Sequence, residues 1–123
     1  MFKQKPTSKA RIDTLIGAKT RINGDVEFGG GFHVDGYING NVKCELDGED
    51  ILSVSEAGCI EGSVVVPNII LNGVVKGDIE ASGRVELGPR SQVLGSVHYT
   101  TIETAVGARI TGKLIHRGKS EVD

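Results

Sequence analysis

Three histidines, His33, His98 and His116, are the first candidates for chemistry, because imidazole serves both as a general base and as a metal ligand. His98 and His116 are 18 residues apart, a separation that could place both side chains on one face of a repeating fold. A zinc-type site needs at least a third protein ligand, and His33 lies 65 residues before His98, with no carboxylate placed beside the pair by its spacing. We therefore predict exposed or structural histidines and no metal site.

Other groupings of reactive side chains also lack the spacing that their chemistry requires. Four acidic residues between positions 45 and 50 do not follow the pattern of a twelve-residue calcium loop. Gly29–Gly31 is followed neither by a lysine nor by a helical pattern, as a phosphate-binding loop would be. Cys44 and Cys59 form no C-x-x-C pair, so we predict two reduced thiols. The sequence predicts a protein that is not an enzyme and has no cofactor.

The composition favours β-strands and excludes several classes of protein. Glycine accounts for 18 of the 123 residues, aromatic residues for 4%, and valine plus isoleucine outnumber leucine 26 to 7, which favours strands over helices. No run is long and apolar enough for a membrane span or a signal peptide, so we expect a cytoplasmic protein. The net charge is −2, with basic ends and an acidic centre, which argues against nucleic acid as the main partner.

A short pattern, aliphatic-x-Gly-x-aliphatic, recurs along the whole chain. Its six copies span residues 22–26, 38–42, 60–64, 75–79, 93–97 and 110–114. The glycines are separated by 16, 22, 15, 18 and 17 residues, and the longest interval contains a polar stretch, 44–50, that predicts a loop inserted at a corner. A repeat of this length is the signature of a solenoid, with one copy in each turn.

The repeat length predicts the architecture of each turn. About 17 to 18 residues accommodate three short strands and three tight corners, and each turn pairs in parallel with its neighbours. We predict an all-β, right-handed parallel β-helix of about six turns with a triangular cross-section. It would span residues 12–116, between disordered tails at 1–11 and 117–123. A left-handed β-helix built from strict hexads is the less favoured form, because the hexad series in this sequence is interrupted.

Both ends of the predicted solenoid lack a polar cap. Solenoids normally close their terminal turns with polar residues, because an open turn exposes the core and a free strand edge. Here both terminal turns stay aliphatic, which predicts end-to-end stacking into a filament. With no nucleotide-binding motif, such assembly should not need nucleotide. The predicted polymerisation interface comprises Ile12, Leu15, Ile16, Ile22, Ile102, Ile110 and Leu114.

The N-terminal tail carries a candidate membrane contact. Phe2 lies beside the cations Lys3 and Lys5. An inserted aromatic ring and cations that each contribute about 1 kcal/mol against anionic lipid are weak in one chain. Repetition along a filament would make the attachment strong through avidity.

The chain resembles the bactofilin family of bacterial cytoskeletal proteins over roughly residues 12–116. The resemblance is carried by the segments 16–26 (IGAKTRINGDV), 32–42 (FHVDGYINGNV) and 107–112 (GARITG). It implies a right-handed triangular β-helix, nucleotide-independent non-polar filaments, and binding to anionic lipid at the inner face of the cytoplasmic membrane. It also implies a scaffold that localises cell-wall synthesis or hydrolysis proteins and helps to set cell shape.

One position departs from the family pattern. Many members place a phenylalanine in the last turn at the position that matches Ile110, which gives this chain a smaller contact area there. The competing prediction is a small left-handed β-helix enzyme, either an acyltransferase or a metal-dependent hydratase, that uses His98 or His116.

Overall fold

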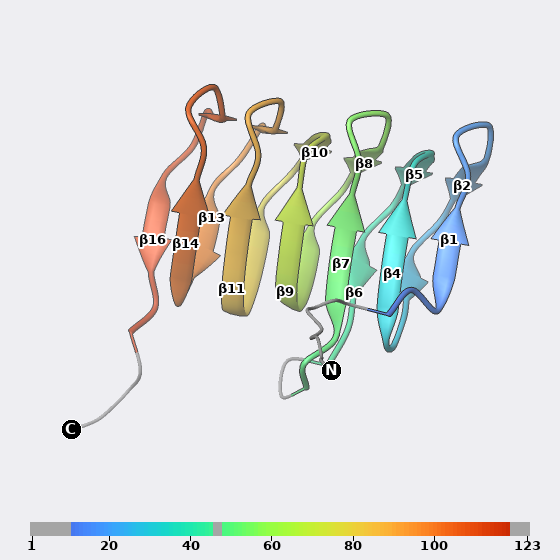
Figure 1. The fold of residues 1–123 in the computed structure, drawn as a ribbon, viewed down its shortest axis with the longest axis horizontal. Coiled ribbons are helices and arrows are strands. Elements are labelled where there is room, and N and C mark those ends of the chain that lie inside the picture. Colours follow the sequence, from blue (N-terminus) through green and yellow to red (C-terminus); the bar gives the residue numbers. More distant parts are fainter. Residues whose placement is uncertain (1–10, 46–47, 119–123) are drawn as a thin grey trace, which may run out of the picture.

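The structure is a computed structural model that describes residues 11–45 and 48–118. The described residues form short β-strands and no helix. The strands, drawn in Figure 1, are β1 Thr14–Ile16, β2 Arg21–Asn23, β3 Val26–Glu27, β4 Gly31–Val34, β5 Tyr37–Asn39, β6 Val42–Lys43, β7 Ile51–Val54, β8 Cys59–Glu61, β9 Val64–Leu71, β10 Val74–Lys76, β11 Ile79–Leu87, β12 Gln92–Val93, β13 Val97–Tyr99, β14 Thr101–Thr104, β15 Arg109–Ile110 and β16 Leu114–His116.

Every strand pairs in parallel with the strand one turn further along the chain. The first face contains β1, β4, β7, the second halves of β9 and β11, and β14. The second face contains β2, β5, β8, β10, β12 and β15. The third contains β3, β6, the first halves of β9 and β11, β13 and β16. Three faces of six strands each make six turns, which confirms the predicted parallel β-solenoid.

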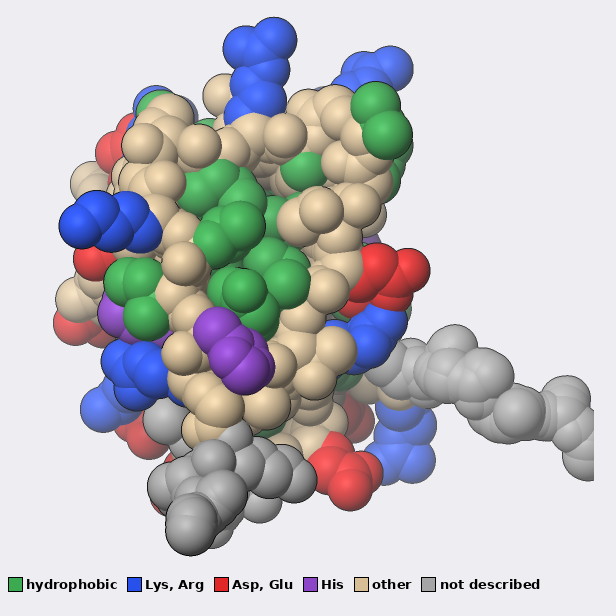
Figure 2. All heavy atoms as spheres, turned by 90° about the vertical axis from the view of Figure 1, so that its left-hand side faces the viewer, with side chains coloured by type: hydrophobic (Ala, Val, Ile, Leu, Met, Phe, Trp, Pro, Cys, Tyr) green, Lys and Arg blue, Asp and Glu red, His purple; other side chains and the backbone are tan. Residues whose placement is uncertain are grey.

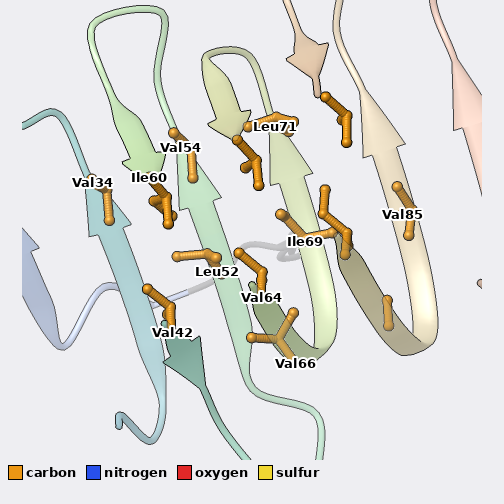
Figure 3. Packing of buried hydrophobic residues seen from close by; sticks show 14 of the residues in the cluster. Val34, Val42, Leu52, Val54, Ile60, Val64, Val66, Ile69, Leu71 and Val85 are labelled. Carbon is orange, nitrogen blue, oxygen red and sulfur yellow. The ribbon is translucent and has the colours of Figure 1, made fainter. Parts of the chain in front are cut away.

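A narrow aliphatic core fills the inside of the solenoid (Figure 3). Inward side chains stack in register, and on the second face Ile38, Ile60 and Val75 follow one another through consecutive turns, each without exposed surface. Outward neighbours alternate with them, as the two-residue period of a strand requires. Phe32 is the one fully buried aromatic side chain within 11–45 and 48–118. A cross-section this small leaves little room for more rings, which explains the low aromatic content.

The recurring glycines form a column at the corner between the second and third faces. A Cβ atom on Gly77 would lie 2.2 Å from the carbonyl oxygen of Gly62 in the preceding turn, and one on Gly62 would lie 2.1 Å from that of Gly40. No side chain fits at such distances, so the corner requires glycine because successive backbones approach closely. The glycine pattern therefore marks corners, as predicted.

Two insertions account for the long interval between Gly40 and Gly62. Residues 44–50 lie between β6 and β7 at the corner that β9 and β11 pass through as continuous strands, so the predicted corner loop is confirmed for its described residues. A hydrogen-bonded turn from Ser55 to Gly58, with 2.9 Å between the Gly58 nitrogen and the Ser55 oxygen, adds further residues before β8. Equivalent turns occur between Gly17 and Thr20 and between Gly88 and Ser91.

Candidate functional site: the two ends of the solenoid

The histidines are not brought together in a catalytic or metal-binding group. The register pairs His98 with Ile115, and Tyr99 with His116, so the last turn is one residue shorter than the 18-residue separation requires. His98 therefore lies on the outward side of β13, whereas His116 lies in the inward column. Within the described residues, no three His, Cys, Asp or Glu side chains are close enough to hold a metal ion.

His33 has a carboxylate neighbour that the spacing did not reveal. Its Nδ1 lies 3.1 Å from the Ser53 hydroxyl and its Nε2 lies 3.0 Å from Asp35. A hydrogen bond from Ser55, followed by the charge of His33, holds the pKa of Asp35 below its ordinary value. This Ser–His–Asp chain lies on the outer surface of the first face. There the backbone of β7 pairs with strands on both sides, which leaves no free amides for an oxyanion hole. We assign it the role of joining two turns.

Both cysteines are free thiols, as predicted. Cys44 is buried in the inward column of the third face, and its sulfur lies 3.2 Å from a carboxylate oxygen of Asp50. Burial, followed by the hydrogen bond to this carboxylate, raises the pKa of Cys44 to about 11. Burial also raises the pKa of Cys59, which is half-buried. Neither thiol is activated as a nucleophile.

The last turn exposes the end of the core. Figure 2 faces this end and shows an apolar patch bordered by backbone, with lysine and arginine side chains around its edge and a histidine beside it. Pairing with the preceding turn identifies the five inward residues of the last turn. They are Ile102, Thr104, Ile110, Leu114 and His116. Leu114 is 50% exposed, whereas Val97, which precedes it in the same column, is fully buried.

The first turn is open in the same way. Its inward residues, identified by pairing with the second turn, are Thr14, Ile16, Ile22, Val26 and Phe28. The Phe28 ring packs against Phe32 with a centroid distance of 5.0 Å, so one side of an aromatic pair belongs to the open end. Among the described residues, four of these five side chains are half-buried against the core and have no further turn beyond them.

Five of the seven predicted interface residues occupy inward positions of the end turns: Ile16, Ile22, Ile102, Ile110 and Leu114. Leu15 pairs with His33 and lies on the outer side of β1, with 57% of its surface exposed. Ile12 precedes β1 and is 56% exposed. Phe28, Thr104 and His116 were missed, although aligning each turn on its recurring glycine could have placed them in the inward columns.

A ladder of side-chain hydrogen bonds runs along one corner from the first turn toward the last. Asp25 accepts the backbone N–H of Asn41 at 2.8 Å, and Asn41 accepts that of Ser63 at 2.9 Å. Further along, Ser96 accepts the N–H of Lys113 at 3.1 Å. Lysine has no acceptor atom, so the ladder stops in the last turn.

The two ends also differ in charge. Residues 14–28 carry Lys19 and Arg21 against Asp25 and Glu27, a balance of zero. Residues 101–117 carry three cations, Arg109, Lys113 and Arg117, against the single anion Glu103, a balance of +2. The C-terminal end therefore presents an apolar patch with a basic border, in agreement with Figure 2.

The tail residues Phe2, Lys3 and Lys5, together with all of 1–10 and 119–123, lie outside the described residues. Arg117, at the start of the predicted C-terminal tail, donates its backbone N–H to the Tyr99 carbonyl oxygen at 2.6 Å. None of the described segments forms a helix with the length and apolarity that a membrane crossing requires.

Comparison with known proteins gives consistent matches over most of the chain. The family model described as bactofilin, polymer-forming cytoskeletal, matches residues 14–115. The chain is 30% identical over 113 residues to bactofilin BacO of Myxococcus xanthus (strain DK1622), covering 92% of this chain and 85% of that one. It is 28% identical over 109 residues to bactofilin BacP of the same strain, covering 88% of this chain but 44% of that one. No solved structure gives a significant match.

Proposed function

Because the chain belongs to the bactofilin family of polymer-forming cytoskeletal proteins, we propose that it polymerises end to end through the open first and last turns of the solenoid. The observation that carries this proposal is the exposure of inward core positions at both ends. A second copy stacked on either end would bury these side chains and cover the free strand edges. The family is structural, so the enzyme alternative that relied on His98 or His116 is wrong.

The filament we propose is non-polar, with first turns meeting first turns and last turns meeting last turns. In a head-to-tail filament, Lys113 would precede Asp25 of the next copy in the corner ladder. Lysine cannot accept the Asp25 N–H, so the ladder would be interrupted at every junction. Two symmetric contacts of different kinds produce an open filament without this defect. Both contacts are apolar, and we propose that assembly needs no nucleotide.

Negative-stain microscopy of the purified protein without nucleotide tests this function. Six turns at about 4.8 Å each give a subunit about 29 Å long. A non-polar filament therefore has an axial repeat of about 58 Å, twice the turn-spacing estimate for one subunit. Particles that remain monomeric at every salt concentration would contradict polymerisation through the ends. Filaments with the single-subunit repeat would instead show head-to-tail contact.

We further propose that the filament lies on the inner face of the cytoplasmic membrane, held by Phe2, Lys3 and Lys5. This proposal is supported by the aromatic–basic character of the tail and by the multiplication of weak contacts along a filament. Deleting residues 1–5 should release filaments from anionic vesicles in a co-sedimentation assay. Replacing only Lys3 and Lys5 by glutamine should weaken binding in a salt-dependent way. Unchanged sedimentation of the deletion variant would refute the tail's role.

The proposed partners are cell-wall synthesis or hydrolysis proteins, which the filament would localise as a scaffold. The flat outer faces of the solenoid support this role, because polymerisation through the ends leaves all three faces available along the filament. Cross-linking in cells, with the wild type compared with a variant that cannot polymerise, would test whether partner capture requires the filament.

A further inference from the structure

His116 is the titratable side chain among the inward residues of the two end turns that the structure describes. It follows Tyr99 in the inward column of the third face, and the two rings lie 5.4 Å apart at 43°. Its Nε2 lies 3.1 Å from the carbonyl oxygen of Thr100. A carbonyl oxygen only accepts, so Nε2 carries a proton and donates it, which leaves Nδ1 free of one in the neutral ring.

The neighbours of His116 offer no carboxylate to balance a positive charge on its ring. On β13 the ring contacts the phenol of Tyr99. Arg117 follows on its own strand, but its guanidinium turns to the outer side, where it donates to His98 Nδ1 at 3.1 Å and lies 3.9 Å from Glu80 of β11. On β14 the inward residues Ile102 and Thr104 are uncharged, while Glu103 lies on the outer side with Glu86.

We propose that His116 is a contact residue between the C-terminal ends of two copies, and that it makes this contact, but not the N-terminal one, sensitive to acid. The proposal rests on the end-to-end assembly proposed above. In a two-fold contact between last turns, both copies of His116 lose water and face apolar side chains. A protonated ring there is a buried charge without a partner, added to two ends that already carry +2 each.

The expected effect is large because two rings are involved. A histidine ordinarily titrates near pH 6.5, so at about pH 5.5 each free end is mostly protonated. If both rings must be neutral in the contact, association of C-terminal ends becomes about a hundredfold weaker at about pH 5.5 than at about pH 7.5. The N-terminal contact has no such group among its inward residues. Acidification would therefore convert filaments into dimers joined through their first turns.

Sedimentation velocity at about pH 7.5 and about pH 5.5, at constant ionic strength, tests this. His116→Gln keeps a donor N–H within reach of the Thr100 carbonyl oxygen but cannot take up a proton. His98→Gln is the matched control, since it changes the same side chain on the outer surface of the adjacent turn. The control also corrects for acid bringing the net charge of −2 toward zero. We expect filaments at both pH values for His116→Gln, and dimers at the lower pH for the wild type and the control.

Two results would overturn the inference while leaving end-to-end assembly intact. One is wild-type filaments of equal length at both pH values, and the other is a His116→Gln variant that disassembles in acid as the wild type does. Release of monomers rather than dimers in acid would show that the N-terminal contact is equally sensitive, and would also overturn it. A wild type that stays monomeric at both pH values would refute the filament itself.

Discussion

Replacing Ile110 by arginine should abolish polymerisation and leave the solenoid folded. Ile110 ends the inward column that contains the buried Val93, and it is half-buried with no turn beyond it. Complete burial of an isoleucine contributes about 1.5–3 kcal/mol, so covering the remaining half in two copies accounts for about 2 kcal/mol of the contact. A buried, unpaired arginine costs several kcal/mol, reduced where its long stem lets the charge reach water. With about 2 kcal/mol for each copy, the total loss is about 6 kcal/mol.

A loss of about 6 kcal/mol weakens the contact by about four orders of magnitude. Sedimentation should therefore show filaments replaced by dimers joined through the remaining N-terminal contact, while the circular-dichroism spectrum keeps its β signal. Leu94→Arg is the matched control. It makes the same kind of exchange next to Val93, but on the outer surface, where Leu94 is 44% exposed. Filaments formed by Ile110→Arg, or equal disruption by both variants, would refute the end-contact reasoning. Loss of the β signal would show that Ile110 is needed for folding.

Two further predictions concern the turns and the buried thiol. Gly77→Ala would place a methyl group 2.2 Å from the Gly62 carbonyl oxygen, so we expect a cost of about 3 kcal/mol or more and a fall in Tm of about 10 °C. Gly17→Ala, where a Cβ meets nothing within 4 Å, should melt close to the wild type, and equal melting of both variants would contradict the crowded corner. With a pKa of about 11, Cys44 in a Cys59→Ser variant should react with iodoacetamide at about pH 8 on the order of a hundredfold more slowly than an unfolded thiol. Equal rates in the folded and the unfolded chain would contradict its burial.

The glycine repeat made the fold predictable because its cause is local. Successive backbones approach too closely at one corner of each turn for any side chain, so the sequence must repeat glycine there whatever surrounds it. The inward columns follow from the same alignment, since Ile38, Ile60 and Val75 stand at the same offset before their glycines.

The end turns were harder to predict because side-chain direction depends on register. Near the ends, turn length changes by one residue or more, and a shift of one residue moves a side chain from the core to the surface. That is why His98 and His116, 18 residues apart, point to opposite sides of one sheet. Leu15 is apolar yet lies outside, beside His33, for the same reason. The Ser53–His33–Asp35 hydrogen bonds join adjacent turns and depend on a pairing that no local motif specifies.

Each internal turn of this solenoid is held by two neighbours, whereas the first and last turns have one each. In a chain of units that interact only with their nearest neighbours, the terminal units are the first to open. Contact with another copy supplies the missing neighbour, so ordering of the end strands and growth of the filament become one thermodynamic event. The backbone amides of β14, β15 and β16 would then exchange with solvent deuterium far more slowly in the filament than in the free protein, while those of β8 and β10 would change little.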